Sequence, residues 1–312
     1  MRERRRGNRL GLWLFIVTTR WLGLRAAYLL LLPVAGYYAL FDRAAVASTQ
    51  PYLRRRFPLA GQARLWFLSW RIFVEQGRCL IDRHYLMAGG TRLQLAVSGI
   101  DRLQVFLAEN HGMILLTSHF GAWQTVIPVL QKLGLPVFLV MRPEQNKAVL
   151  DALQVSKSTA NVQIIPVDEF VSHAGSLVAA LATGGIVAIM GDRHYGAATL
   201  PVQFLGEKAF FPYGAFAVAA ATGSPAAIML AAKTGHDSYQ IELTEPFRPV
   251  YDRTRTKQEQ LTAWVQIYAN TIERFAQHHP LQCFLYQDVW QPPPTPEPAG
   301  LDVSIPCPRQ HS

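Results

Sequence analysis

Hydrophobic residues follow two different patterns along the chain, and the change comes near residue 101. Before it, apolar positions recur at helical spacing over 65–83 and alternate with polar positions over 93–98. After it, short apolar runs alternate with amphipathic stretches. The patterns predict strands at 93–98, 112–117, 136–141, 162–166, 186–190, 226–230 and 239–244, and helices at 65–83, 102–109, 122–133, 151–159, 173–183, 213–222 and 258–278. Strands that alternate with helices favour an α/β fold with a mostly parallel sheet and helices on both faces.

The first 60 residues are basic and apolar. Arginines at positions 2, 4, 5, 6 and 9 precede an apolar stretch, 10–41, that Arg20 and Arg25 interrupt. Its longest uncharged part, 26–41, has about 16 residues, fewer than the ~20 that a helix needs to span the hydrocarbon core. We therefore expect a membrane anchor that either spans marginally or lies in the interface as an in-plane or re-entrant segment, with its arginine-rich flanks on the cytoplasmic side. A pair of buried helices is the alternative.

Composition narrows the class of protein further. Half of the 312 residues are hydrophobic, 16% are charged, the mean hydropathy is +0.11 and the net charge is +9. These values fit a domain on a bilayer surface, and the positive charge favours anionic lipid headgroups or an acidic protein as partners. From Gln291 onward the chain is rich in proline. We expect three parts: an anchor at 1–60, an α/β domain at 61–290 and a disordered tail at 291–312.

The strongest candidate for chemistry is the block Thr117-Ser118-His119-Phe120-Gly121-Ala122-Trp123-Gln124. His119 follows an expected buried strand, at the sheet edge where active sites of such folds lie, and Gly121 opens the next expected helix. A histidine with a pKa near neutrality can take the proton of a hydroxyl, and N–H groups at a helix start can stabilise an oxyanion. A histidine after a strand also fits a purely structural role.

The block resembles the His-x-x-x-x-Asp/Glu motif of the glycerolipid acyltransferases, and most of all the lipid A late acyltransferases, the lauroyl and myristoyl acyltransferase family. The resemblance continues through most of the chain, in Met141-Arg142-Pro143, Gly191-Asp192-Arg193, Phe204-Leu205-Gly206, the stretch from Phe211-Pro212-Tyr213-Gly214 to Gly223-Ser224-Pro225, and the stretch from His279-Pro280 to Trp290.

This resemblance implies a glycerolipid-acyltransferase-like fold and transfer of a fatty acyl group from a thioester of acyl carrier protein or coenzyme A. The acceptor would be a hydroxyl of a glycolipid or lipid-like molecule. The resemblance also implies that no metal or organic cofactor is required, and that the protein works on the cytoplasmic face of a bacterial inner membrane. An ordinary glycerophosphate-type acyltransferase shares the same chemistry and is the nearest alternative.

One position departs from the family's pattern. Where the family has an acidic residue that orients the imidazole and stabilises its charged form, the chain has Gln124, whose amide oxygen accepts a hydrogen bond but carries no charge. Asp192, just after the expected strand 186–190, is the natural substitute, although an aspartate there also fits a turn cap. The catalytic candidates are therefore His119, Gln124 and Asp192. A weakened or inactive relative that binds lipid or acyl chains stays open as an alternative.

Residues that bind the substrates are expected at the same edge. Arg142 follows the expected strand 136–141, and by the resemblance it would hold a phosphate of the acceptor or of the donor's phosphopantetheine arm. Arg193 adds a second positive charge, for phosphate or for an ion pair with Asp192.

The segment 203–214 is expected to be a loop that enters a helix. By the resemblance this region would help hold the acceptor, through Phe211, Tyr213 and Gly214, although aromatic residues beside proline also fit core packing. The remaining histidines lack metal-ligand spacing, and no nucleic-acid recognition motif accompanies the basic residues. We therefore expect neither a metal site nor a nucleic-acid partner.

Overall fold

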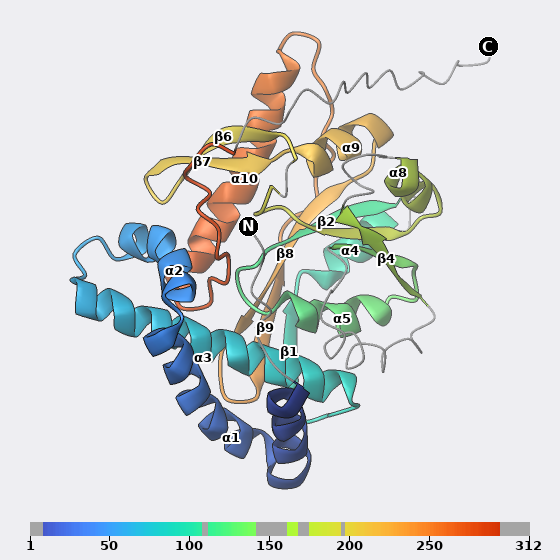
Figure 1. Cartoon of the computed structure of the whole chain (residues 1–312). Coiled ribbons are helices and arrows are strands. Elements are labelled where there is room, and N and C mark those ends of the chain that lie inside the picture. The colour runs from blue at the N-terminus through green and yellow to red at the C-terminus, as the bar shows by residue number, and fades with distance from the viewer. Residues whose placement is uncertain (1–8, 108–111, 142–160, 168–174, 195–196, 294–312) are drawn as a thin grey trace.

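The computed structural model describes residues 9–107, 112–141, 161–167, 175–194 and 197–293. The expected helix at 151–159, Arg142 and positions 294–312 of the proline-rich tail lie outside these residues. A seven-stranded sheet occupies the centre of the molecule, in the order β1-β9-β8-β2-β5-β3-β4 (Figure 1). Its strands are β1 (Gln94–Ser98), β2 (Met113–Thr117), β3 (Val137–Met141), β4 (Val162–Pro166), β5 (Ile186–Met190), β8 (Ala226–Lys233) and β9 (Ser238–Leu243).

The five strands from β8 to β4 run parallel to one another, and β9 returns antiparallel to β8 with β1 parallel to it. The central strands are buried on both faces: every residue of β2 and β8 is buried. Strands covered on both sides read as continuous apolar runs, which is why the sequence pattern located them closely. The expected mostly parallel sheet is confirmed.

Helices cover both faces of the sheet. On one face, Ile114, Leu116 and Ile228 join a core with side chains of α3 (Gln62–Met87), α9 (Gly214–Thr222) and α10 (Lys257–His278). On the other face, Met113 and Leu115 pack with side chains of α4 (Ile100–Leu107) and α5 (Ile127–Gln131). Alternate residues of one strand therefore feed two separate cores, as the period of two in a strand requires. The helix α8 (Gly175–Ala182) packs on the first of these faces.

Two expectations about local structure are wrong. Instead of one helix over 122–133, the chain forms a short 3₁₀ helix, η1 (Trp123–Val126), followed by α5. Instead of a loop over 203–214, it forms an antiparallel hairpin of β6 (Thr199–Phe204) and β7 (Glu207–Pro212). Leu205 and Gly206 make the hairpin's turn with positive φ angles of 52° and 79°. Two such residues in succession are typical of a type I′ turn, whose twist matches that of the flanking strands.

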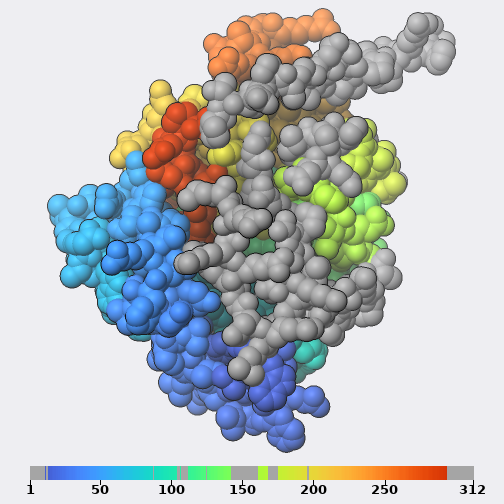
Figure 2. Space-filling model, viewed as in Figure 1, coloured from blue at the N-terminus to red at the C-terminus, as the bar shows by residue number. Residues whose placement is uncertain are grey.

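Three helices precede the sheet: α1 (Arg9–Phe41), α2 (Arg43–Arg56) and α3. They form one end of the molecule, the blue region in Figures 1 and 2. Within α1, the segment Trp13–Phe41 has the length and the apolar composition to cross a membrane, with a mean hydropathy of 1.5 and a third of its hydrophobic window buried in the protein. The N-terminal apolar helix expected from the sequence is therefore present.

Candidate functional site

The pairing of β2 with β5 brings His119 and Asp192 together. In the parallel register Thr117 is the partner of Met190, and these are the last residues of their strands. His119 and Asp192 each follow two residues later, so both side chains belong to the same edge of the sheet, beyond the carboxyl ends of its central strands. The edge expected from the sequence is the one on which the two residues meet.

Asp192 is a fully buried carboxylate with three hydrogen-bond donors around it. His119 Nδ1 lies 2.7 Å from Oδ1, while the backbone N–H of His119 donates to Oδ2 at 2.6 Å and the Ser118 hydroxyl donates to the same oxygen at 2.7 Å. The imidazole is 15% exposed and the carboxylate is 0% exposed. A carboxylate on Nδ1 places the ring proton there, which leaves Nε2 with its lone pair as the free base.

Burial and charge set the protonation of this pair. Burial lowers the pKa of His119 below its ordinary value; Asp192 opposes that shift, and the nearby positive charge of Arg193 adds to it. For Asp192, burial raises the pKa, but the charge and hydrogen bond of His119, with Arg193 and Ser118, outweigh burial and leave a net lowered pKa. At neutral pH the site therefore holds a carboxylate beside a neutral imidazole, the state that a general base requires.

The backbone after His119 is fixed by two neighbouring segments. Gly121 has a φ of +79° and donates its N–H to the carbonyl of Gln282, and Ala122 donates to the carbonyl of Ala231 in β8. The carbonyl of His119 accepts from the backbone N–H of Phe284. A side chain at position 121 would meet the Ala231 backbone, so glycine is required for this close approach.

The N–H groups of Phe120, Gly121 and Ala122 are already paired: the Ser118 hydroxyl, the Gln282 carbonyl and the Ala231 carbonyl accept from them. The helix that follows begins only at Trp123. Donors at 120–122 therefore serve the fold of the loop.

The other expected site residues fall in different places. Arg193 adjoins the pair and donates from Nη2 to the carbonyl of Phe284 at 2.7 Å. Phe211 is fully buried and makes edge-to-face ring contacts with Phe204 and Tyr268, which is the core-packing alternative considered for it.

Tyr213 and Gly214 are half-buried residues at the start of α9. The backbone of Gln124 lies in η1, whereas Arg142 lies just beyond β3, outside the described residues.

Sequence reasoning missed two residues that fix the site. Tyr268 is fully buried in α10 and donates its hydroxyl to the carbonyl of Thr117, at the end of β2. The buried Gln282 side chain forms two hydrogen bonds with the backbone of Lys233, accepting from its N–H at 2.9 Å and donating to its carbonyl at 2.7 Å. Both residues lie more than a hundred positions from His119, and no local pattern links them to it.

An apolar pocket adjoins the same edge on the face covered by α5. Its walls come from the ends of β2, β3 and β5, and from η1 and α5, and include Thr117, Met141, Met190, Trp123, Ile127 and Leu130. One of the lining residues, Thr117, is only two positions before His119 in the sequence.

Comparison with known proteins identifies the family. No curated protein matches the chain. Residues 75–291, 217 of the 312, match the family model of the bacterial lipid A biosynthesis acyltransferases. The matched region includes the whole central sheet, His119 and Asp192. Since the match extends over more than half of the chain and agrees with the motifs in the sequence, the protein belongs to the bacterial lipid A biosynthesis acyltransferase family.

Proposed function

We propose that the protein transfers a fatty acyl group from a thioester to a lipid hydroxyl, with His119 as general base and Asp192 as the residue that orients it. One observation carries the proposal: Nδ1 of His119 lies 2.7 Å from the buried carboxylate of Asp192, at the carboxyl edge of the sheet. Family membership supplies the reaction class, acyl transfer of the lipid A type. Gln124 is not needed for the tautomer, because Asp192 already fills that role.

In the proposed reaction, Nε2 of His119 takes the proton of the acceptor hydroxyl as its oxygen attacks the thioester carbonyl. The new C–O bond gives a tetrahedral oxyanion, and Asp192 stabilises the imidazolium that forms beside it. The oxyanion then collapses, the C–S bond breaks, and the leaving sulfur takes the proton from Nε2. The products are an ester and a free thiol, and the imidazole returns to its neutral state.

The chemistry around the pair suggests the substrates. The walls of the pocket beside Thr117 are apolar, so an acyl chain is a better chemical match for this surface than a polar group. Arg193, and by the resemblance Arg142, would hold phosphate, either of a glycolipid acceptor or of the donor's phosphopantetheine arm. The net charge of +9 suits an acidic acyl carrier protein or the anionic coenzyme A as the donor, and it attracts anionic lipid. For Tyr213 and Gly214, contact with the acceptor stays part of the proposal.

The proposed location is the cytoplasmic face of a bacterial inner membrane. Residues 1–60 would form the anchor, 61–290 the acyltransferase domain and 291–312 a tail without a catalytic role. An apolar first helix preceded by arginines supports this arrangement, because positive residues stay on the cytoplasmic side.

A second candidate function is a catalytically weakened relative that binds lipid or acyl chains. The observation in its favour is Gln124, a neutral residue where the family's motif has an acidic one. Such a protein would retain the pocket and the net positive charge while turning over slowly or not at all.

Acyl transfer by the purified full chain distinguishes these candidates. Lauroyl and myristoyl thioesters of acyl carrier protein and of coenzyme A are offered with a membrane lipid extract, and mass spectrometry follows the acylated lipids. The proposed function requires transfer by the wild type and its loss in His119→Ala. No transfer by the wild type, with lipid binding intact and transfer gained in Gln124→Glu, would instead establish the weakened relative.

A further inference from the structure

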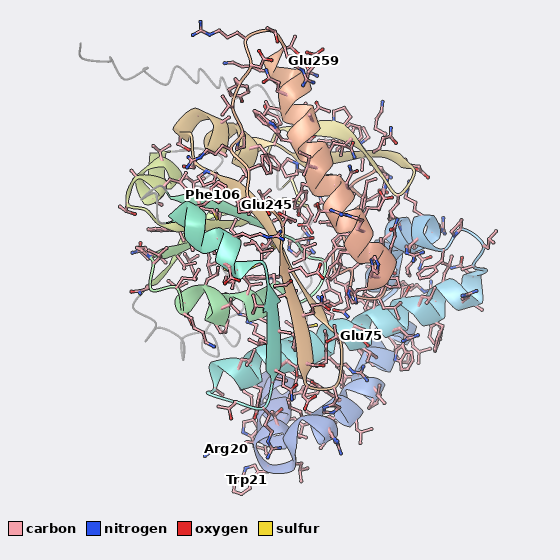
Figure 3. All side chains as sticks on the ribbon, turned by 180° about the vertical axis from the view of Figure 1, so that it is seen from behind. Arg20, Trp21, Glu75, Phe106, Glu245 and Glu259 are labelled. Carbon is pink, nitrogen blue, oxygen red and sulfur yellow. The ribbon has the colours of Figure 1, made fainter. Side chains whose placement is uncertain are left out.

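The first helix is bent into two arms. Gly23 has φ 80° and ψ 177°, far from helical values, so α1 consists of an arm at 9–22 and an arm at 24–41. In Figures 1 and 3 the arms meet in a corner at the lower end of the molecule, and Figure 3 labels Arg20 and Trp21 at that corner. At about 1.5 Å per residue the arms are roughly 21 Å and 27 Å long. The segment Trp13–Phe41 is long enough to cross a membrane only as one straight helix, because neither arm alone reaches the ~30 Å of a hydrocarbon core.

The second arm is packed along its length on the protein. Its buried side chains recur every three or four positions and face α3, the helix with which α1 makes its main contact: Leu24, Ala27, Tyr28, Leu31 and Ala35. At Gly77 of α3 a Cβ would collide with the Leu31 side chain, so the two helices approach closely there. The second arm is therefore part of the folded domain. A transmembrane helix that stands apart from its domain would not bury side chains against α3 in this way.

A buried polar cluster fastens the same arm to the sheet. The hydroxyl of Tyr28 donates to Asp82 of α3, and Asp82 forms an ion pair with Lys233 of β8 at 2.6 Å. Tyr239 of β9 donates to the same carboxylate, and Lys233 donates to the carbonyl of His236 at 2.7 Å. Loss of the partner would leave an uncompensated buried charge, which is strongly destabilising. Separation of the arm from the domain is correspondingly unfavourable.

The corner is apolar, exposed and flanked by cations. Trp21 is 78% exposed and Leu22 is 72% exposed, and Arg20 and Arg25 on either side are exposed as well. Leu29 continues the exposed apolar face along the second arm. Adjacent exposed apolar side chains between cations form a patch that can bind a membrane surface. Tryptophan and leucine between arginines fit the boundary between acyl chains and anionic headgroups.

We propose that the corner at Gly23 is a wedge that enters a single leaflet of an anionic phospholipid bilayer, so that both arms begin and end on the same side of the membrane. Trp21 and Leu22 lie among the acyl chains, and Arg20 and Arg25 contact phosphates. The cluster around Asp82 fixes the wedge to the sheet, so insertion of the wedge also fixes the distance between the domain and the membrane surface. The proposal does not depend on the chemistry of His119.

Binding to vesicles tests whether the corner is the insertion site. The full chain is mixed with vesicles of phosphatidylethanolamine and phosphatidylglycerol, and the bound fraction is measured by flotation. Leu22→Glu is expected to lower the partition coefficient by about tenfold or more, because the transfer of the leucine side chain from water to the acyl chains is lost. Val250→Glu is the matched control, since Val250 is 68% exposed and precedes α10, the helix whose Glu259 lies at the opposite end in Figure 3. Equal binding of the two variants would overturn the proposal.

Thiol labelling of sealed inverted inner-membrane vesicles tests the bend. Trp13→Cys, Trp21→Cys and Phe41→Cys, each at an exposed position in α1, are made in a Cys307→Ser background and treated with an impermeant maleimide. Cys79 and Cys283 are buried, and burial raises the pKa of the Cys79 thiol to about 12, so both stay silent. The wedge requires labelling at positions 13 and 41 without detergent and at 21 only with it. Opposite sides for 13 and 41 establish a spanning helix, and free labelling at 21 establishes a corner in water; either result refutes the wedge.

Discussion

Replacement of Asp192 by asparagine changes one atom and should move one proton. Oδ2 accepts from two donors, the backbone N–H of His119 and the Ser118 hydroxyl, whereas Oδ1 faces His119 Nδ1. A backbone N–H cannot turn away, so the amide oxygen of asparagine takes the Oδ2 position and its NH₂ group faces Nδ1. Nδ1 must then accept rather than donate, and the ring proton shifts to Nε2. The atom that should receive the acceptor's proton is thereby already protonated.

The magnitudes separate a chemical effect from a structural one. The same substitution in the serine-protease triad forces the wrong tautomer and lowers kcat by about 10⁴. The loss of one charged hydrogen bond in a site that keeps its shape costs about 1–3 kcal/mol of stability. We therefore expect Asp192→Asn to remain folded, with a lowered Tm, while its acyl transfer falls by about three to four orders of magnitude.

Rates and tautomers are measured on the same preparations. Initial rates of ester formation from a lauroyl thioester give kcat, and ¹⁵N NMR of the histidine side chains reports which nitrogen carries the proton. Ser118→Ala is the matched control, because it removes one donor to Oδ2 and leaves the partner of Nδ1 in place; its rate should stay within about tenfold of the wild type. An Asp192→Asn variant that is folded and transfers within tenfold of the wild-type rate would refute the assignment of the base.

Three further changes test the surroundings of the site. A histidine acts as a base only when neutral, so kcat/KM should fall as the pH drops through the pKa of His119, which burial holds below the ordinary ~6.5. Arg193→Met removes a nearby positive charge and should raise this pKa. The fall in kcat/KM should then begin at a higher pH in a pH–rate profile. Gln282→Leu leaves the N–H and carbonyl of Lys233 without their buried partners and should lower stability by about 2–4 kcal/mol in urea unfolding. Lys233→Met leaves Asp82 buried without its cation and should cost about 3–5 kcal/mol by the same measurement.

The sheet could be predicted from the sequence because its strands are buried on both faces. Continuous apolar runs such as 113–117 and 186–190 have few alternatives to a central strand, and glycine or polar residues bound them on both sides. The hairpin at 199–212 could not be predicted in the same way. Its turn uses Leu205 with a φ of 52°, whereas sequence signals for such turns rely on asparagine, aspartate or glycine at both central positions.

The contacts between segments that are distant in the chain could not be predicted from the sequence. His119 and Asp192 were both identified as candidates, because each follows an apolar strand and strands of a parallel sheet share an edge. The pairing of Gln282 with Lys233, and the approach of Ala231 to Gly121, arise from segments that pack only in the folded chain. The same is true of the buried cluster around Asp82.

The position of the carboxylate follows from the order of the strands rather than from the motif around His119. The chain does not turn into a helix directly after His119: Gly121 and Ala122 first bond to Gln282 and β8, and the helix begins at Trp123. Asp192 reaches the imidazole through the pairing of β5 with β2. Thr117 and Met190 are partners in this register, and His119 and Asp192 each follow two residues after them. A neutral residue at 124 therefore removes a carboxylate from the motif without removing the partner of Nδ1. The Asp192 carboxylate, whose pKa is lowered by His119, still places a negative charge beside the imidazole.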